Sequence, residues 1–503
     1  MKRVASVLLP AIGVDRSLPT PLHRQIYDAF RMAVSHGDLR PGQRVPSSRE
    51  LAAELKISRF PVVNAYAQLM TEGYLETWVG AGTAISRVLP ERRLEADAVK
   101  TATTHRTESP RATARRMEEL TPARPLPWLR GTGSFRVGEV ASEVFPFKIW
   151  AGLAVRSARL MAADALQNSD AMGYPPLRSA IAEYLRTSRR LRCEDSQIMI
   201  VNGTQQALHI CGLALLEPGA PIWMEEPGYG FARDALSFSR CRFIPVPVDR
   251  EGLNVRQGIR MCPKAKAALV TPSHQFPLGV TMSLQRRMEL LNWASSSGAW
   301  ILEDDYDSEF RYESPPLACM QGLDVDARVI YLGSFSKVLF PALRIGYLVL
   351  PPDLVAAFRA IRLSVDFSRA SFEQRVLTDF LAEGHFARHL RRMRLTYSER
   401  RTALVENIQR QLGADFPVVG DDAAIQLVMK LPRGFRDREL ADRAAKESFW
   451  LWPLSATYFA SKPQSGFVLG FGGTPAEAMP RAVSRLKTLL EGERSSSSAA
   501  NRR

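Results

Sequence analysis

Between about residue 131 and residue 492, short apolar runs alternate with segments whose apolar residues recur at helical spacing. The clearest runs are Ile198–Val201, Pro221–Met224, Ala267–Thr271, Trp300–Leu302 and Val329–Leu332. Buried strands that alternate with helices build a mainly parallel sheet with helices on both faces. We therefore expect an α/β fold in which ligands bind at the carboxyl ends of the strands.

A polar segment divides the chain, which at 503 residues is too long for a single core. Residues 87–130 contain many charged residues and few large apolar side chains, so this segment cannot offset the entropy cost of ordering. We expect a flexible linker there, between an N-terminal unit at 1–86 and a larger domain at 131–492. The serine-rich end at 493–503 is expected to be disordered.

The composition limits the partners of the chain. A formal net charge of +15 favours a polyanionic partner such as nucleic acid. The five cysteines form no C-x-x-C pair, which argues against a zinc site and a disulfide framework. No apolar run approaches the roughly 18 residues of a membrane span, and the first residues are too quickly interrupted for a secretory signal. We expect a cytoplasmic protein without a metal or a membrane contact.

The N-terminal unit contains three helical patterns and a glycine-rich turn. Ser47 and Ser48 can cap the second pattern, Arg49–Leu55, and the third, Arg59–Met70, starts three residues after the second ends. This spacing is typical of a helix-turn-helix whose second helix enters the major groove of DNA. Residues 73–85 then predict a wing of two short strands. On spacing alone, a three-helix interaction module remains an alternative, which the net charge weakens.

This unit closely resembles the GntR-type winged helix. The matching segments are Pro46 to Leu51, Ser58-Arg59, Tyr66 to Leu69, Glu72 to Leu75 and Gly80 to Thr83. The resemblance implies binding to double-stranded operator DNA through Ser48, Arg49, Ser58, Arg59, Gly80, Gly82 and Thr83. Pro61 departs from the pattern and removes a backbone donor that could meet a phosphate.

Lys337 lies close to two hydroxyl groups and a guanidinium, since it follows Ser334 and Ser336 and precedes Arg344 by seven residues. A lysine in this setting could form an imine with a carbonyl while its neighbours hold an attached phosphate. This pattern indicates pyridoxal 5'-phosphate. An isolated Ser-x-x-Lys is, however, most often a solvated loop, so the cofactor needs support from other segments.

Three further segments follow predicted strands and offer the remaining parts of such a site. The run Glu303–Asp307 supplies an anion for the pyridine nitrogen, although a run of acids is more often a solvated face or a metal site. Gly203, Thr204 and Gln205 open a helix, so backbone donors face an incoming anion. Tyr229 could stack on a heterocycle, although a loop tyrosine more often serves packing.

Together these residues resemble the fold-type I aminotransferases, with a large part at about 175–375 and a smaller α+β part at about 376–492. The resemblance implies that Lys337 is the Schiff-base lysine and that Asp304 pairs with the pyridine nitrogen. It also implies that Tyr306 approaches the phenolic oxygen and that Tyr229 stacks on the ring. The other cofactor contacts that it implies are Gly203, Thr204, Gln205, Ser334, Ser336 and Arg344.

Three positions depart from the pattern of working aminotransferases. Phe276 stands where they have an asparagine that donates to the phenolic oxygen, and His274 or Gln275 is expected to replace it. Val468 stands where they have an arginine that clamps the substrate carboxylate, so a bidentate contact is lost. Asn168 replaces a tyrosine that reaches the neighbouring subunit's phosphate. We expect weak or no transaminase activity.

A winged helix joined by a long linker to an aminotransferase-like domain is similar to the layout of the MocR subfamily of bacterial transcription regulators. The segments 271–279 and 303–312 look typical of that subfamily. The resemblance implies a homodimer with head-to-tail domain swapping, which binds DNA at the nucleoid and senses pyridoxal 5'-phosphate or an amine joined to it. An active aminotransferase with an accessory DNA-binding domain is the alternative, and a cofactor reservoir without a DNA target is a third hypothesis.

The effector is less constrained than the cofactor. Phe231 occupies a position at which regulators of this type that bind a linear amino acid can have an arginine, so a GABA-like ligand is disfavoured. Arg178 and Arg233 are candidate anion contacts.

Overall fold

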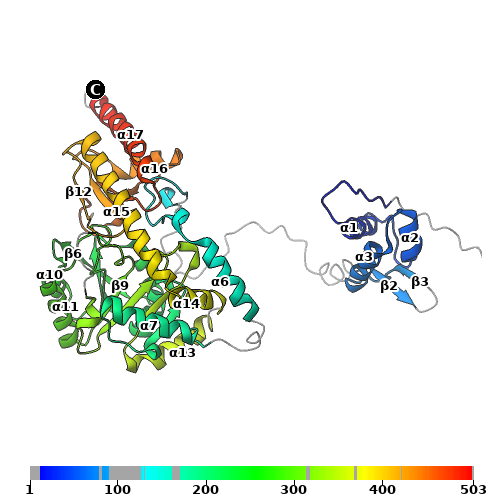
Figure 1. Cartoon of the computed structure of the whole chain (residues 1–503), viewed down its shortest axis with the longest axis horizontal. Helices are drawn as coiled ribbons and strands as arrows, with labels where there is room; N and C mark the ends of the chain where they lie inside the picture. The colour runs from blue at the N-terminus through cyan, green and yellow to red at the C-terminus, as the bar shows by residue number, and fades with distance from the viewer. Residues whose placement is uncertain are drawn as a thin grey trace, which may run out of the picture. The chain divides into compact units, whose positions relative to one another are not determined.

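The computed structural model describes residues 12–78, 82–89, 126–129, 131–160, 170–312, 318–367, 371–420 and 422–500. For residues 494–500 it describes the backbone alone. The chain separates into two compact units, residues 1–112 and 113–503, each of which is described by itself (Figure 1). Residues 90–125, most of the expected linker, lie outside the described residues, so the linker stays a prediction.

The N-terminal unit is a three-helix core with a small antiparallel sheet, as the sequence predicts. Its elements are α1 (Leu22–Ser35), β1 (Arg44–Val45), α2 (Ser48–Glu54), α3 (Arg59–Thr71), β2 (Leu75–Trp78) and β3 (Gly82–Ile85). The sheet order is β1-β3-β2, and the short strand β1 was not expected from the sequence. Side chains from all three helices fill the core, where the Phe30 and Tyr66 rings meet edge to face at 5.5 Å.

The two helices of the helix-turn-helix begin differently. Before α2, the Ser47 hydroxyl accepts a hydrogen bond from the Glu50 backbone N–H at 3.3 Å, and the Glu50 carboxylate accepts one from the Ser47 N–H at 2.8 Å. This reciprocal capping box satisfies two donors that the helix leaves without partners. Ser58 occupies the equivalent position before α3 but makes no capping hydrogen bond with its side chain.

The second unit contains an eight-stranded sheet in the order β4-β11-β10-β9-β8-β5-β6-β7. Its strands are β4 (Ile198–Val201), β5 (Pro221–Glu226), β6 (Arg242–Asp249), β7 (Gly252–Leu253), β8 (Ala267–Val270), β9 (Trp300–Asp305), β10 (Val329–Ser334) and β11 (Gly346–Val349). The strands from β10 to β6 pair in parallel, whereas β4, β11 and β7 add antiparallel pairs at the two ends. The predicted α/β fold is confirmed, with a mixed sheet.

Helices cover both faces of this sheet. Along β5, Ile222 and Met224 pack with the α8 and α9 side of the unit, whereas Trp223 between them packs with α10 and α11. The alternation explains why the strands are apolar throughout. The helices are α6 (Phe147–Leu160), α7 (Pro175–Arg189), α8 (Thr204–Leu215), α9 (Gly230–Ser237), α10 (Val255–Met261), α11 (Leu284–Ser297), α12 (Met320–Leu323), α13 (Val355–Val365) and α14 (Phe372–Ala382).

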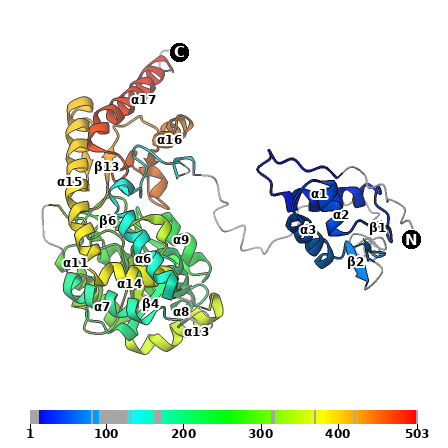
Figure 2. The same ribbon diagram turned by 45° about the vertical axis from the view of Figure 1, so that its right-hand side comes forward.

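The long helix α15 (His385–Leu412) leads from the large part of this unit into a smaller α+β part (Figure 2). That part has a four-stranded antiparallel sheet in the order β12-β13-β15-β14, formed by β12 (Val418–Val419), β13 (Gln426–Lys430), β15 (Gly466–Gly470) and β14 (Trp452–Pro453). Helices α16 (Asp437–Lys446) and α17 (Met479–Ala500) pack with it. In the described part of the chain, no helix is both long and apolar enough to cross a membrane.

The tail at 493–503 differs from the expectation. Helix α17 continues to Ala500, and residues 501–503 lie outside the described residues. Val483, Leu486 and Leu490 are buried and hold the earlier turns of the helix against the core. Extending a helix that is already formed adds one hydrogen bond for each residue ordered, and the serine-rich segment therefore continues it.

The two helix starts lead to a stability prediction. Ser47→Ala should destabilise α2 by about 1 kcal/mol because it removes the cap, whereas Ser58→Ala should cost much less because that side chain caps nothing. Hydrogen exchange of the backbone amides in α2 and α3, followed by mass spectrometry on the full chain, measures both effects. Equal losses of protection in the two variants would contradict the capping argument.

Candidate functional site

A cavity of about 310 Å³ lies at the carboxyl ends of the central strands. Residues from both parts of the second unit line it, together with the segment that precedes α6. The lining residues are Leu129, Arg136, Val137, Gly138, Gly203, Thr204, Gln205, Tyr229, Phe231, Thr271, Phe276, Asp304, Tyr306, Ser334, Ser336, Lys337, Pro341, Arg344, Gln426 and Trp452. Ten of the twelve expected cofactor contacts are therefore together in one cavity.

Strand alternation selects Asp304 from the acidic run. Its neighbours are engaged elsewhere: Glu303 accepts hydrogen bonds from the backbone of Met320 and Gln321, and Asp305 accepts one from the Tyr331 hydroxyl at 2.6 Å. Asp304 lines the cavity, and its buried Oδ1 has no hydrogen-bond partner among the described residues. A buried carboxylate oxygen without a partner indicates a ligand donor at this point.

The same burial changes the acidity of Asp304. Loss of water raises its pKa to about 7, and the negative charges of Asp305 and Glu225 act in the same direction. A positively charged N–H group on a ligand would reverse this effect by stabilising the carboxylate.

No cluster of histidine, cysteine or acidic side chains in the described ranges could hold a metal ion.

Lys337 reaches the cavity from the loop after β10. Its Nζ donates a hydrogen bond to the Gly138 carbonyl oxygen at 3.3 Å. Burial lowers the pKa of Lys337 to about 8, against the attraction of Asp307 and with a further contribution from the positive charge of Arg136. A lysine with such a pKa holds a large neutral fraction near pH 8, as a nucleophile requires.

The backbone at the contact with Lys337 favours a glycine at position 138. A Cβ atom on Gly138 would lie 2.1 Å from the lysine Nζ, and φ at this residue is +84°. A side chain at this position would therefore displace the end of Lys337, and the positive φ would strain the backbone of any other residue. No strand pattern precedes Gly138 in the sequence, so this wall of the cavity was not expected.

Donors for an anion gather at the start of α8. Gly203, with φ +84°, precedes the first helical residue, Thr204, and the helix directs its unpaired N–H groups at the cavity. The Gln205 Nε2 atom is buried and has no hydrogen-bond partner in the described part of the chain. Ser334 and Arg344 line the same cavity.

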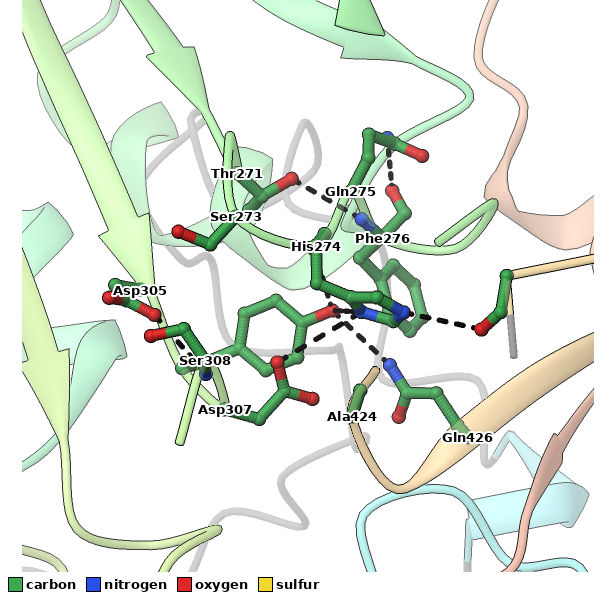
Figure 3. Close-up of polar contacts among 12 residues, drawn as sticks. Thr271, Ser273, His274, Gln275, Phe276, Asp305, Asp307, Ser308, Ala424 and Gln426 are labelled. Carbon is green, nitrogen blue, oxygen red and sulfur yellow. Dashed lines mark hydrogen bonds and ion pairs between the residues drawn. The ribbon is translucent and has the colours of Figure 1, made fainter. Parts of the chain in front are cut away.

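A polar network joins the two parts of the unit behind Tyr306. The Tyr306 hydroxyl donates to the His274 carbonyl oxygen at 3.1 Å, lies 3.0 Å from His274 Nδ1 and accepts from Gln426 Nε2 at 3.3 Å. Figure 3 shows His274 and Gln426 pointing toward one another from different segments. Burial lowers the pKa of His274 to about 4, so its ring is neutral at pH 7. Gln426 comes from β13, and it thereby ties the small part to the cavity.

His274 and Gln275 do not line the cavity, contrary to the expectation that one of them replaces the missing asparagine. The His274 ring is held between Tyr306 and the Gly420 carbonyl oxygen, 3.4 Å from Nε2. The Gln275 amide donates to the Pro227 carbonyl oxygen at 2.9 Å and to Glu225 at 3.3 Å. Their side chains therefore bond to neighbouring segments outside the cavity, and the amide that bonds to Tyr306 from within the cavity lining is that of Gln426.

The expected anion contacts also lie elsewhere. Arg178 forms an ion pair with Asp170 at 3.2 Å. Arg233 lies 4.8 Å from the centre of the Phe459 ring, beside a second cavity of about 350 Å³. Val468 is fully buried within β15 and does not line the first cavity. Asn168 lies outside the described residues.

Several lining residues were not expected from the sequence. They are Leu129, Arg136, Val137, Gly138, Thr271, Pro341, Gln426 and Trp452. Phe231 and Phe276 also line the cavity, at positions where the sequence comparison implies contacts to a ligand and to the cofactor. For Leu129 to Gly138, the sequence signal is the pair of glycines at 133 and 138, just after the expected linker. Glycines at this spacing indicate turns, which a flexible linker does not need.

The expected DNA contacts lie at the starts of the two helices of the helix-turn-helix and on the wing. Ser48, Arg49, Ser58 and Arg59 are exposed or half-buried, and Arg59 Nε donates to Ser48 Oγ at 3.1 Å. That bond holds the Arg59 side chain between α2 and α3. Gly82 and Thr83 begin β3, and Gly80 lies outside the described residues.

Comparisons with known proteins agree with this division. The family model of bacterial regulatory proteins of the gntR family matches residues 22–85, and that of aminotransferase class I and II matches residues 148–486. The chain is 38% identical to the probable rhizopine catabolism regulatory protein MocR of Rhizobium meliloti, over 94% of this chain and 95% of that protein. It is 31% identical to the pyridoxine biosynthesis transcriptional regulator PdxR of Corynebacterium glutamicum, over 92% and 94%.

Among solved structures, the second unit is similar to the kynurenine aminotransferase of Pyrococcus horikoshii in complex with PMP. The TM-score is 0.67 at 27% sequence identity, over 80% of this chain and 99% of that protein. The alignment therefore spans nearly the whole enzyme, including the strands that end at the cavity.

The pKa of Lys337 predicts the pH dependence of its reaction with pyridoxal 5'-phosphate. The neutral amine reacts, and its fraction rises with pH through a midpoint near 8 rather than near 10.5. The rate at which imine absorbance develops should follow this midpoint, and free N-acetyl-lysine should follow the ordinary one. A common midpoint for both amines would contradict the effect of burial.

The Gly138 contact predicts a specific loss. Gly138→Ala should reduce covalent attachment of pyridoxal 5'-phosphate roughly tenfold or more, because the new methyl group displaces Lys337 and strains the backbone. Gly152→Ala is the matched control, since a Cβ there meets nothing within 4 Å and the residue lies within α6. Absorbance titration measures attachment, and circular dichroism checks folding. Normal attachment in Gly138→Ala would refute the steric argument.

Proposed function

The chain belongs to the MocR-type regulators of the gntR family, and on this premise we propose that it regulates transcription in response to pyridoxal 5'-phosphate or an amine joined to it. It is a DNA-binding regulator with an aminotransferase-like domain. The observation that carries the proposal is a cavity with the groups for the cofactor but without an arginine at position 468.

Pyridoxal 5'-phosphate fits the groups of the cavity. Asp304 would hold the pyridine nitrogen, since its buried oxygen has no other partner among the described residues. The start of α8 with Gln205, together with Ser334, Ser336 and Arg344, would hold the phosphate. Tyr229 would lie against the ring. When bound, the cofactor supplies a carbonyl carbon that reacts with primary amines.

Position 468 explains why we favour a sensor over an enzyme. An enzyme must orient its substrate as well as attach it, and a missing carboxylate clamp costs factors of roughly a thousand in rate. The alternative, an active aminotransferase with an accessory DNA-binding domain, is favoured by the retained Lys337 and Asp304. Mixing the protein with amino acids in a single turnover separates the two functions, because only the enzyme converts the bound cofactor to its amine form.

We also propose that the protein is a cytoplasmic homodimer, bound at the nucleoid, whose subunits exchange their DNA-binding units head to tail. Helix α6 supports a second copy as a partner, because Phe147, Val155 and Leu160 are more than half exposed on it. Exposed apolar residues in such numbers on one helix indicate a protein interface. A membrane contact is not part of the proposal.

The regulator function predicts a specific pattern of DNA affinity. Arg49→Ala and Arg59→Ala should weaken binding to the DNA upstream of the gene itself and reduce the slope of log affinity against log salt by about one each. Arg250→Ala removes the same charge from an exposed turn of the second unit and should change neither quantity. Fluorescence anisotropy at several salt concentrations measures them.

Lys337→Ala tests the sensor part of the proposal separately. It should keep basal DNA binding but abolish any change in affinity that pyridoxal 5'-phosphate or an amine produces. Effector-dependent DNA binding that persists in Lys337→Ala, together with wild-type protein that shows no imine absorbance, would exclude covalent sensing. Loss of DNA binding in Arg250→Ala alone would exclude the winged helix as the DNA contact.

A further inference from the structure

Two arginines line the cavity among the described residues, and they belong to different segments. Arg344 follows the serines of the Lys337 loop, where the phosphate is proposed. Arg136 lies in the segment before α6, which contributes no phosphate contact. The cavity therefore contains a guanidinium that the cofactor does not require.

Arg136 has hydrogen-bonding capacity to spare. Its Nη2 donates to the Leu129 carbonyl oxygen at 3.0 Å, which fixes the side chain. Its Nε atom is buried and has no hydrogen-bond partner in the part of the chain that the structure describes. A fixed guanidinium with a buried, unused N–H group is suited to an oxyanion, which it can bind through two parallel hydrogen bonds.

Arg136 also lies near the point of covalent attachment. Its positive charge contributes to the lowered pKa of Lys337. Gly138, two residues further along, accepts the hydrogen bond from Lys337 Nζ at 3.3 Å. An acid bound to Arg136 would therefore lie close to an amine that occupies the place of this Nζ atom.

Another wall of the cavity is aromatic and suits an apolar group of a ligand. The Phe276 ring centre lies 5.4 Å from that of Trp452, and the Phe231 ring centre lies 6.2 Å from it. All three rings line the cavity with Leu129. Such a wall favours a ligand whose body is apolar.

We propose that Arg136 binds the acidic group of the effector, and that the effector is a primary amine with a carboxylate or sulfonate and an aromatic or branched apolar body. Arg136 would thus perform the role that Val468 cannot. The inference rests on the proposed function, since it names the ligand class of the same cavity. Because Arg136 belongs to the segment nearest in sequence to the linker, ligand binding would act directly on the chain that leads to the DNA-binding unit.

Matched pairs of amines test the role of the acid. The full-length protein, loaded with pyridoxal 5'-phosphate, is titrated with L-phenylalanine and 2-phenylethylamine, with L-leucine and 3-methylbutylamine, and with 2-amino-3-phenylpropane-1-sulfonate and 2-phenylethylamine. The change in imine absorbance gives each affinity. In at least one pair the wild type should prefer the acid by roughly 10- to 100-fold. The carboxylate and sulfonate pairs identify which acid the site takes.

Variants then assign the preference to one residue. Arg136→Gln should reduce the preference for the acid over its acid-free partner to within about threefold, and Arg136→Lys should retain part of this preference. Arg233→Gln, at the second cavity, should retain all of it. Arg136→Gln should also move the midpoint of imine formation to higher pH, because a positive charge near Nζ has gone.

The possible failures are distinguishable. Wild-type protein that shows no imine absorbance would refute the proposed function itself. Protein that forms the imine but binds both members of every pair equally would refute the acidic effector alone. A preference that survives Arg136→Gln, or that disappears in Arg233→Gln, would show that Arg136 is not the anchor.

Discussion

The cavity depends on a carboxylate that is buried without a partner. Taking an ionised Asp304 out of water costs free energy, and in the described residues no donor compensates its Oδ1 atom. The sheet places it there because β9 directs Glu303 and Asp305 to other partners and leaves Asp304 facing the cavity. A ligand with a protonated ring nitrogen would remove this cost. The site is therefore less favourable empty than filled, as a cofactor site should be.

Three separate parts of the second unit must meet to close the cavity around this acid. The large sheet supplies Asp304 and Lys337, the small part supplies Gln426, and the segment before α6 supplies Arg136 and Gly138. Each junction is made by a specific contact, because the Gly138 carbonyl oxygen accepts a hydrogen bond from Lys337 and Gln426 is bonded to the Tyr306 network. A change in the bound ligand would therefore alter contacts with all three parts at once, as the proposed sensing requires.

Two differences from working aminotransferases lead to the same conclusion. By the resemblance to working aminotransferases, Phe276 and Val468 stand where those enzymes have polar groups, and of the two only Phe276 lines the cavity, where its ring packs against Trp452. The groups that attach a cofactor remain, whereas the arginine expected for a substrate carboxylate does not. Arg136 offers a different place for an acid, on the segment that follows the linker. These differences support the proposal that the site recognises a ligand and does not convert it.

The sequence alone determined the winged helix and the α/β sheet, and ten of the residues that it predicts as cofactor contacts line one cavity, because these features depend on local patterns: caps, apolar runs and residues that directly follow a strand. It did not indicate that helix α17 continues into the serine-rich tail. Nor did it indicate that the side chains of His274 and Gln275 bond to other segments and do not line the cavity. Only the tertiary structure brought in Arg136 and Gln426, which come from segments without a strand-end pattern. Their roles depend on contacts between residues far apart in the chain, and no local pattern encodes such contacts.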